Sequence, residues 1–139
     1  MSPHMPPPEL VDSHCHLDFA DFEGELPQII DRARAAGVTR MVTICTRLRL
    51  EPRVRAIAEA HVGVFYAAGT HPMSAAEEPM ATVRELVALA SHPKFVGIGE
   101  SGLDYHYTAD SAEVQKTFTA TGNTDVVALQ TLVNEVIPN

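Results

Sequence analysis

The sequence predicts an α/β fold in which parallel strands alternate with helices. Short apolar runs and amphipathic stretches follow one another four times between residues 10 and 100. The expected strand starts, at Leu10, Met41, Val64 and Phe95, are separated by 31, 23 and 31 residues, about the length of one strand, one helix and two short loops. Strands joined by such helices run parallel, because each helix returns the chain to the same end of the sheet.

Hydrophobic spacing predicts the individual elements. Short apolar runs predict strands over residues 10–14, 40–45, 62–69 and 95–100. Apolar residues that recur every three or four positions predict helices over residues 25–37, 51–60 and 80–91. Pro27 and Pro52 suit the first turn of a helix, and Gly37 suits the position just after the last turn.

Units of this kind close either into a doubly wound sheet or into an eight-unit TIM-type barrel. A complete barrel needs about 250 residues, so a chain of 139 residues holds roughly half of one. Residues 1–9 contain four prolines and no apolar periodicity, and we expect a flexible leader there. We expect residues 10–118 to form the β/α domain and residues 119–139 to form a helical tail.

The composition excludes several classes of protein. The chain is 45% hydrophobic and 20% charged, with no apolar run long enough to span a membrane. Two cysteines are too few for a disulfide framework, so we expect a reducing, cytoplasmic compartment. A net charge of −8 argues against a broad basic surface that binds nucleic acid. It does not argue against local binding through a metal ion, which reverses the field around it.

The first candidate site is the motif VDSHCHLDF near the start of the chain. Alternate side chains of a strand share a face, so His14 and His16 present two imidazoles side by side while Cys15 points the other way. This arrangement can hold one metal ion. The alternatives are two polar residues in a loop for the pair, and a small buried hydrophobe rather than a third ligand for Cys15. The flanking carboxylates of Asp12 and Asp18 favour the metal site.

The second candidate is the stretch VGIGESGLDYH, in which Gly99 and Glu100 end the fourth strand. Glu100 leaves that strand at its carboxyl end, where the histidine pair also lies. Two imidazoles and a carboxylate could therefore converge in a combination suited to Zn²⁺, Mn²⁺ or Fe²⁺. Helix capping is the alternative role for Glu100. Asp104 either orients a ligand or substrate or shapes the turn around it.

The remaining histidines divide by the end of the strands at which they are expected. His71 follows the third strand on the same rim, where it would contact a phosphate or a ligand, with an ordinary surface loop as the equal alternative. His106 is a weaker candidate for substrate contact. The candidates for substrate binding are thus His71, Asp104 and His106. His92, at the amino end of the strands, and His61, near a helix end, are expected to be structural.

Together, the motifs VDSHCHLDF, GTHPM and GIGESGLDYHY, in this order at three strand ends, resemble the TatD family of metal-dependent hydrolases over residues 10–118. The resemblance implies a TIM-barrel-type fold and one or two divalent metal ions per site, Zn²⁺, Mg²⁺ or Mn²⁺. It implies a DNase that hydrolyses DNA or another phosphodiester, with a metal-activated water attacking phosphorus. By the same likeness, His14 and His16 match the family's first pair of metal ligands and Glu100 matches its bridging carboxylate.

The chain departs from the family pattern in two places. Met73 stands where the family usually has the second histidine of Gly-x-His-Pro-His, so any substrate contact there is lost or altered. From Thr119 onward the sequence no longer follows the family, and no histidine follows His106. The two later histidine ligands of the family therefore have no counterpart. Asp125 is expected to cap a helix of the tail rather than to act as the catalytic aspartate.

Half a barrel exposes the edge of its last strand and its inner face. We expect the tail or a second copy of the chain, in a homo-oligomer, to cover them. With half of the ligands missing, we also expect weak metal binding and low nuclease activity. Two other functions stay open: an inactive paralogue that serves as an interaction module or has no role, and an amidohydrolase-type enzyme that hydrolyses esters or amides.

Overall fold

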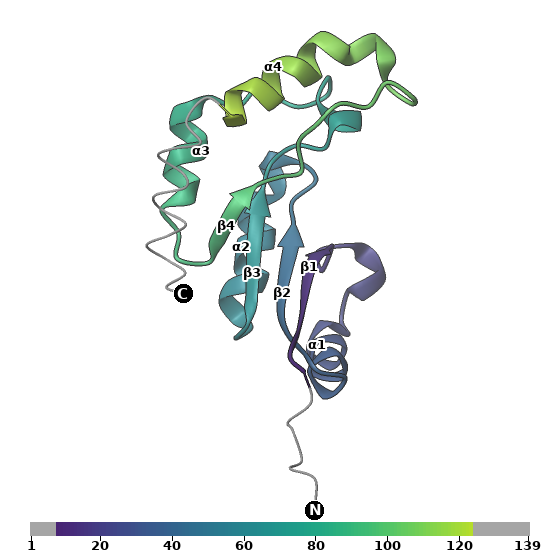
Figure 1. Ribbon diagram of the computed structural model, residues 1–139, viewed down its shortest axis with the longest axis vertical. Helices are drawn as coiled ribbons and strands as arrows, with labels where there is room; N and C mark the ends of the chain where they lie inside the picture. Colours follow the sequence, from purple (N-terminus) through teal and green to yellow (C-terminus); the bar gives the residue numbers. More distant parts are fainter. Residues whose placement is uncertain (1–7, 124–139) are drawn as a thin grey trace, which may run out of the picture.

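The computed structural model describes residues 8–123, in which four parallel strands form one sheet in the order β1-β2-β3-β4 (Figure 1). The strands are β1 (Leu10–Cys15), β2 (Val38–Ile44), β3 (Val64–Ala68) and β4 (Phe95–Ile98). The helices are α1 (Leu26–Ala35), α2 (Glu51–Ala60), α3 (Val83–Ala90) and α4 (Ala112–Asn123). The first three helices connect successive strands, so the predicted alternation of parallel strands and helices is confirmed.

Three of the four strands begin where the sequence predicts. Leu10, Val64 and Phe95 are the first residues of β1, β3 and β4. β2 begins at Val38, three residues before the predicted Met41, because Val38 already pairs with Leu10 of β1. Residues 38–40 are Val-Thr-Arg and contain no apolar run that would predict a strand. They belong to β2 because they pair with β1 across the sheet.

The first three helices lie within their predicted ranges. Pro27 and Pro52 occupy the first turns of α1 and α2, as expected for a residue without a backbone donor. Gly37, just after α1, has a φ of 95°, which is the left-handed conformation expected of a glycine that follows a helix. None of the described helices combines the length and the apolar character needed to cross a membrane.

The end of the predicted β/α domain falls within a helix. The sequence predicts a boundary between residues 118 and 119, but α4 continues through both residues without a break. Residues 124–139 of the expected tail, with Asp125, lie outside the described residues, as do residues 1–7 of the expected leader.

The main core lies where the helices pack on the sheet. Its fully buried members come from both layers: Ile30, Val54, Ala58, Val64, Tyr66, Ala68 and Phe95. Tyr66 has no exposed surface, and its hydroxyl donates a hydrogen bond of 3.1 Å to Glu51 at the start of α2. That bond gives a partner to two polar groups that would otherwise be costly to bury.

The residues that alternate with this core are less well covered. Val42, Phe65 and Val96 occupy the intervening positions of β2, β3 and β4, and all three are only half-buried. At the free edge of β1, Leu10 and Val11 are 51% and 58% exposed. The described sheet thus has one face packed against helices, one apolar face partly open, and two unpaired edges.

Candidate metal centre

His14 and His16 lie side by side at the carboxyl end of β1. Their rings meet edge to face with centroids 5.1 Å apart, as predicted for alternate residues of a strand. The backbone N–H of His14 donates to the carboxylate of Asp12 at 3.0 Å, within the part of β1 where the pairing with β2 shifts register. The side chain of Cys15 points elsewhere, and its thiol donates to the carbonyl of Val42.

His16 is oriented by contacts on two sides. Its Nδ1 lies 3.0 Å from the carbonyl oxygen of Ile44 and must donate to it, because a carbonyl can only accept. The ring also stacks on Phe19, with centroids 4.6 Å apart. With the proton on Nδ1, the lone pair of Nε2 is free to bind a metal ion, which is the usual arrangement of a histidine ligand.

Glu100 reaches the pair because the chain after β4 crosses the end of β3. The backbone N–H of Gly99 still bonds to Ala68 of β3, at 3.1 Å, but that of Glu100 bonds to Cys45 beyond β2, at 3.0 Å. The crossing passes directly over Gly69. A Cβ at Gly69 would lie 2.3 Å from the carbonyl oxygen of Glu100 and 2.7 Å from the carbonyl carbon of Gly99, so only glycine leaves room for it.

The crossing brings three potential ligands together. One side-chain atom each from His14, His16 and Glu100 lie within 4.8 Å of one another. His14 Nε2 lies 3.2 Å from a Glu100 carboxylate oxygen. Two imidazole nitrogens and one carboxylate oxygen suit Zn²⁺ or Mn²⁺. The His14 side chain is 53% exposed, so the cluster is open to solvent, as a catalytic site requires.

His71 lies on the other side of the same carboxylate. Its backbone N–H bonds to Thr46, and its Nδ1 accepts the backbone N–H of Met73 at 3.1 Å. The proton of the neutral ring is therefore on Nε2, 4.0 Å from the second oxygen of Glu100. In this tautomer Nε2 carries a proton instead of a free lone pair, and 4.0 Å is too long for a direct hydrogen bond to Glu100.

Asp104 uses its carboxylate to shape its own loop. One oxygen accepts the backbone N–H groups of His106 and Tyr107, and the other accepts the hydroxyl of Thr108. Although partial burial raises the pKa of Asp104, these hydrogen bonds outweigh it and hold the pKa below its ordinary value. Of the two roles that the sequence leaves open, these contacts favour turn formation. His106 is exposed, and its ring packs edge to face against Tyr107.

Two polar residues beside the cluster are buried: Asp18, which flanks the histidine motif, and Thr43, which the sequence pattern did not single out. Asp18 is 7% exposed, and its Oδ1 has no hydrogen-bond partner among the described residues. Thr43 is fully buried in β2, and its hydroxyl accepts the backbone N–H of Leu17, just after the histidine pair. A threonine within the apolar run MVTIC was the signal that could have indicated the second.

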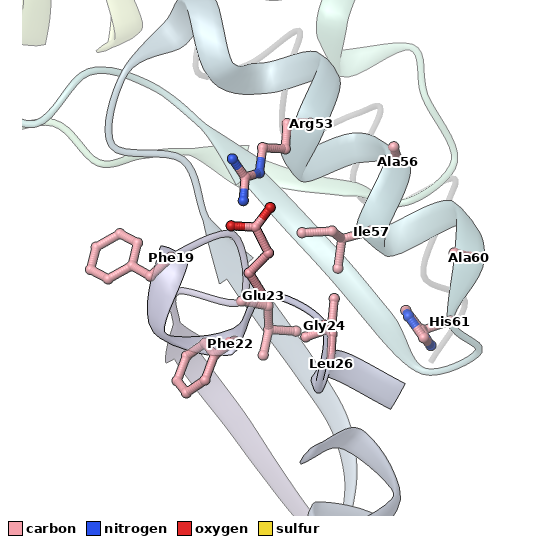
Figure 2. A pocket seen from close by; sticks show the side chains of 11 residues that line it. Phe19, Phe22, Glu23, Gly24, Leu26, Arg53, Ala56, Ile57, Ala60 and His61 are labelled. Atoms are coloured by element: carbon pink, nitrogen blue, oxygen red, sulfur yellow. The ribbon is translucent and has the colours of Figure 1, made fainter. Parts of the chain in front are cut away.

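The structural histidines lie away from the cluster. His92 contacts Glu59 at 2.9 Å and packs edge to face against Tyr66, in keeping with the role expected for it. His61 lines a cavity of about 370 Å³ between α2 and the segment that precedes α1 (Figure 2). Glu23 and Arg53 point toward one another across this cavity, which contains neither His14 nor Glu100. Phe19 lines the cavity and also stacks on His16, so Phe19 contacts both the cavity and the His14–His16–Glu100 cluster.

Comparison with known proteins identifies relatives over most of the chain. The family described as TatD related DNase matches residues 11–121. An uncharacterized metal-dependent hydrolase, YabD of Bacillus subtilis, is 36% identical over 110 residues, covering 77% of this chain and 42% of YabD. The 3'-5' ssDNA/RNA exonuclease TatD of Cronobacter turicensis is 35% identical over 111 residues, covering 79% of this chain and 42% of that protein.

A solved structure extends the comparison to the fold. The crystal structure of YjjV, a TatD homolog from Escherichia coli, superimposes with a TM-score of 0.70 at 26% identity. The match covers 91% of this chain and 47% of YjjV. The predicted TIM-barrel-type fold is confirmed, and the described sheet and helices are part of such a barrel. The chain spans less than half the length of these three relatives.

Proposed function

The chain belongs to the family of TatD-related DNases, and on that premise we propose that it is a metal-dependent hydrolase that cleaves phosphodiester bonds. The observation that carries the proposal is the convergence of His14, His16 and Glu100 within 4.8 Å. Relatives that match most of this chain are named metal-dependent hydrolases, and one is named an exonuclease of single-stranded DNA and RNA.

The three residues fit a divalent ion by the chemistry of their donors. Nε2 of His16 is free because Nδ1 is bound to Ile44, and the carboxylate of Glu100 offers a second oxygen beside the one near His14. Zn²⁺, Mg²⁺ and Mn²⁺ are the candidate ions. When bound, such an ion polarises a phosphoryl oxygen and lowers the pKa of a water molecule.

The protein's own residues would then orient the ligands and the substrate. Phe19 covers one face of the His16 ring and keeps it in the orientation set by Ile44. His71 directs an N–H toward Glu100. At 4.0 Å this N–H does not reach the carboxylate itself, so it is free to donate to a phosphate oxygen that binds next to Glu100. Its loss would weaken substrate binding or turnover without removing a ligand.

Metal content is the direct test of the ligand set. We expect elemental analysis of the chain after equilibrium dialysis against Zn²⁺ or Mn²⁺ to show weakly bound metal, and the double variant His14→Ala/His16→Ala to lose it. His61→Ala, which removes an imidazole outside the cluster, is the matched control and keeps the metal. Circular dichroism on each variant checks that the fold persists. Metal retained by the double variant would refute the assignment.

Hydrolysis is tested on substrates that separate the candidate functions. We expect cleavage of single-stranded DNA or RNA, or of bis(p-nitrophenyl) phosphate, that depends on added metal and is lost in Glu100→Gln. Cleavage of acyl esters or amides alone would favour the amidohydrolase-type alternative instead. Bound metal with no cleavage of any substrate would favour the non-catalytic alternative.

A further inference from the structure

Aromatic side chains gather in the exposed loop between β4 and α4. Tyr105 and Tyr107 are 52% and 73% exposed, and His106 between them is exposed as well. The chain has only three tyrosines, and the third, Tyr66, is fully buried in the core. A single exposed aromatic residue is ordinary on a protein surface. Three consecutive exposed rings in a chain with 6% Phe, Trp and Tyr are a concentration that packing does not explain.

Hydrogen bonds from α4 fix the backbone of the loop that carries these rings. Gln115 of α4 is 1% exposed, and its amide accepts the backbone N–H of Asp104 at 2.6 Å. The same amide donates to the carbonyl oxygens of Asp104 and Thr108, at 3.1 and 2.8 Å. Asp104 in turn accepts the backbone N–H of Tyr107. The backbone beneath the rings is therefore ordered before any ligand binds, which lowers the entropic cost of binding.

The loop begins at the candidate metal centre. Tyr105 follows Glu100 by five residues, and five residues of chain span at most about 18 Å. Figure 1 shows the segment after β4 leaving the carboxyl end of the sheet before it enters α4. A strand of a few nucleotides whose phosphate lies at Glu100 would thus pass within reach of the loop.

The charges nearby argue for the bases rather than the phosphates as the groups that this loop binds. Residues 101–111 contain no lysine or arginine, and the whole chain carries a charge of −8. Lys116 of α4 is the nearest cation in sequence, and it is already paired with Glu113 at 2.7 Å. Phosphate neutralisation needs clustered cations, whereas every nucleobase has a flat face that stacks on an aromatic ring.

We propose that Tyr105, His106 and Tyr107 form a stacking platform for the unpaired bases of single-stranded nucleic acid. This inference rests on the proposed phosphodiester hydrolysis and adds to it a subsite that binds the bases of the substrate. Stacking supplies the affinity that an acidic surface cannot. Base pairs of a duplex keep their faces stacked on one another, so the platform selects single strands.

Tyrosine fluorescence tests the proposal directly, because the chain has no tryptophan and two of its three tyrosines are on the platform. The titration is done in EDTA, so that no hydrolysis occurs. We expect oligothymidylate or oligouridylate to quench the emission with saturation, and an abasic oligonucleotide of the same length to leave it unchanged. The stronger quencher of the two identifies DNA or RNA as the preferred source of the bases.

Variants then separate stacking from general apolar contact. By anisotropy of a labelled oligothymidylate, Tyr105→Leu and Tyr107→Leu should each lower affinity roughly 5- to 150-fold, the range for loss of one base–aromatic stack. Tyr107→Phe should retain affinity because it keeps the ring. Val62→Ala, at an apolar residue that is 86% exposed, is the matched control and should bind as the parent does.

Several results would overturn the platform. These are equal affinity for abasic or duplex DNA, unchanged affinity in both leucine variants, and emission that changes with protein concentration alone, which would mean that the rings pack against a second copy. Salt dependence is a further check. In a plot of log affinity against log salt concentration, each phosphate contact should contribute a slope of no more than about 0.7. Metal binding and hydrolysis are measured separately, so saturable quenching by a chain that binds no metal would refute the proposed function alone.

Discussion

Just after β3, the lack of a side chain on Gly69 allows the backbone of Glu100 to lie close to the strand end. Gly69 has backbone atoms of Gly99 and Glu100 directly above its Cα, closer than any Cβ could tolerate. Neighbouring strands are about 4.8 Å apart, so β1 and β4, with two strands between them, would be roughly 14 Å apart in a flat sheet. The crossing over Gly69 shortens that separation, so that His14 and Glu100 come within 3.2 Å.

Gly69→Ala should therefore damage both the fold and the metal centre. We expect a loss of about 2 kcal/mol or more in the free energy of unfolding, since the methyl group overlaps backbone, and at least tenfold weaker metal binding. Gly97→Ala is the matched control, because a Cβ on β4 at that position meets nothing within 4 Å. Urea denaturation and metal titration measure the two effects. Equal stability and metal affinity in the two variants would show that the crossing is not constrained by Gly69.

Cys45 illustrates how burial sets the chemistry of a single residue. Burial raises the pKa of its thiol, and the carboxylates of Asp18 and Glu51 add to the rise. Hydrogen bonds from the backbone at Arg47 and Gly69 lower the pKa by a smaller amount, so that it lies at about 11. The neutral thiol is the form that the folded chain favours. Cys45 is thus a packing residue and not a nucleophile or a ligand at neutral pH.

A pH dependence follows from this raised pKa. Unfolded thiols ionise near the ordinary value of 9.0, while the folded thiol keeps its proton up to about 11. The stability contributed by Cys45 is therefore complete below pH 9 and is lost as the pH rises from 9 toward 11. Denaturation across this range should show a steeper decline in the parent than in Cys45→Ala. Identical slopes, or rapid alkylation of Cys45 in the folded chain at pH 8, would contradict the assignment.

Among the elements, α3 has the best-defined beginning. The hydroxyl of Thr82 accepts the backbone N–H of Glu85, and the carboxylate of Glu85 accepts the backbone N–H of Thr82. Such a capping box satisfies two donors that the helix cannot pair internally. α3 buries Leu86 and Ala90 and packs on β4, the strand that leads to Glu100.

Thr82→Ala should lower the free energy of unfolding by about 1 kcal/mol, whereas Thr82→Ser keeps the cap and should cost little. The hydrogen bonds from Thr82 hold the pKa of Glu85 below its ordinary value of 4.5. The contribution of the cap is therefore complete above pH 4.5 and is lost as the pH falls through the lowered pKa. Thermal denaturation of the parent and of Thr82→Ala at pH 7 and below pH 4 measures both effects. A loss of stability in Thr82→Ala that is larger at low pH than at pH 7 would contradict this role of the cap.

For the described residues taken together, the sheet has open edges and one partly open face. β1 and β4 are unpaired edges within the described residues, and Leu10 and Val11 of β1 are both more than half exposed. Exposed edges and apolar faces favour association.

We therefore expect the 139-residue chain to form a homodimer through β1. Light scattering with size-exclusion chromatography should give twice the 15.1 kDa mass at micromolar concentration. Val11→Lys places a charge on the free edge and should yield a monomer, while Val62→Lys, at an exposed apolar residue outside the sheet, should not. A monomeric parent at that concentration would exclude this dimer.

The sequence by itself determined the alternation of strands and helices, the strand ends that carry the histidine pair and Glu100, and the family. These depend on the period of apolar residues and on short motifs, which reflect neighbours close along the chain. Only the tertiary structure decided how the ligands meet. The tautomer of His16 depends on Ile44, 28 residues away, and Glu100 reaches His14 by crossing Gly69. The platform of Tyr105 and Tyr107 likewise depends on Gln115 from α4. Such contacts form between segments that only folding brings together, and no local pattern of residues encodes them.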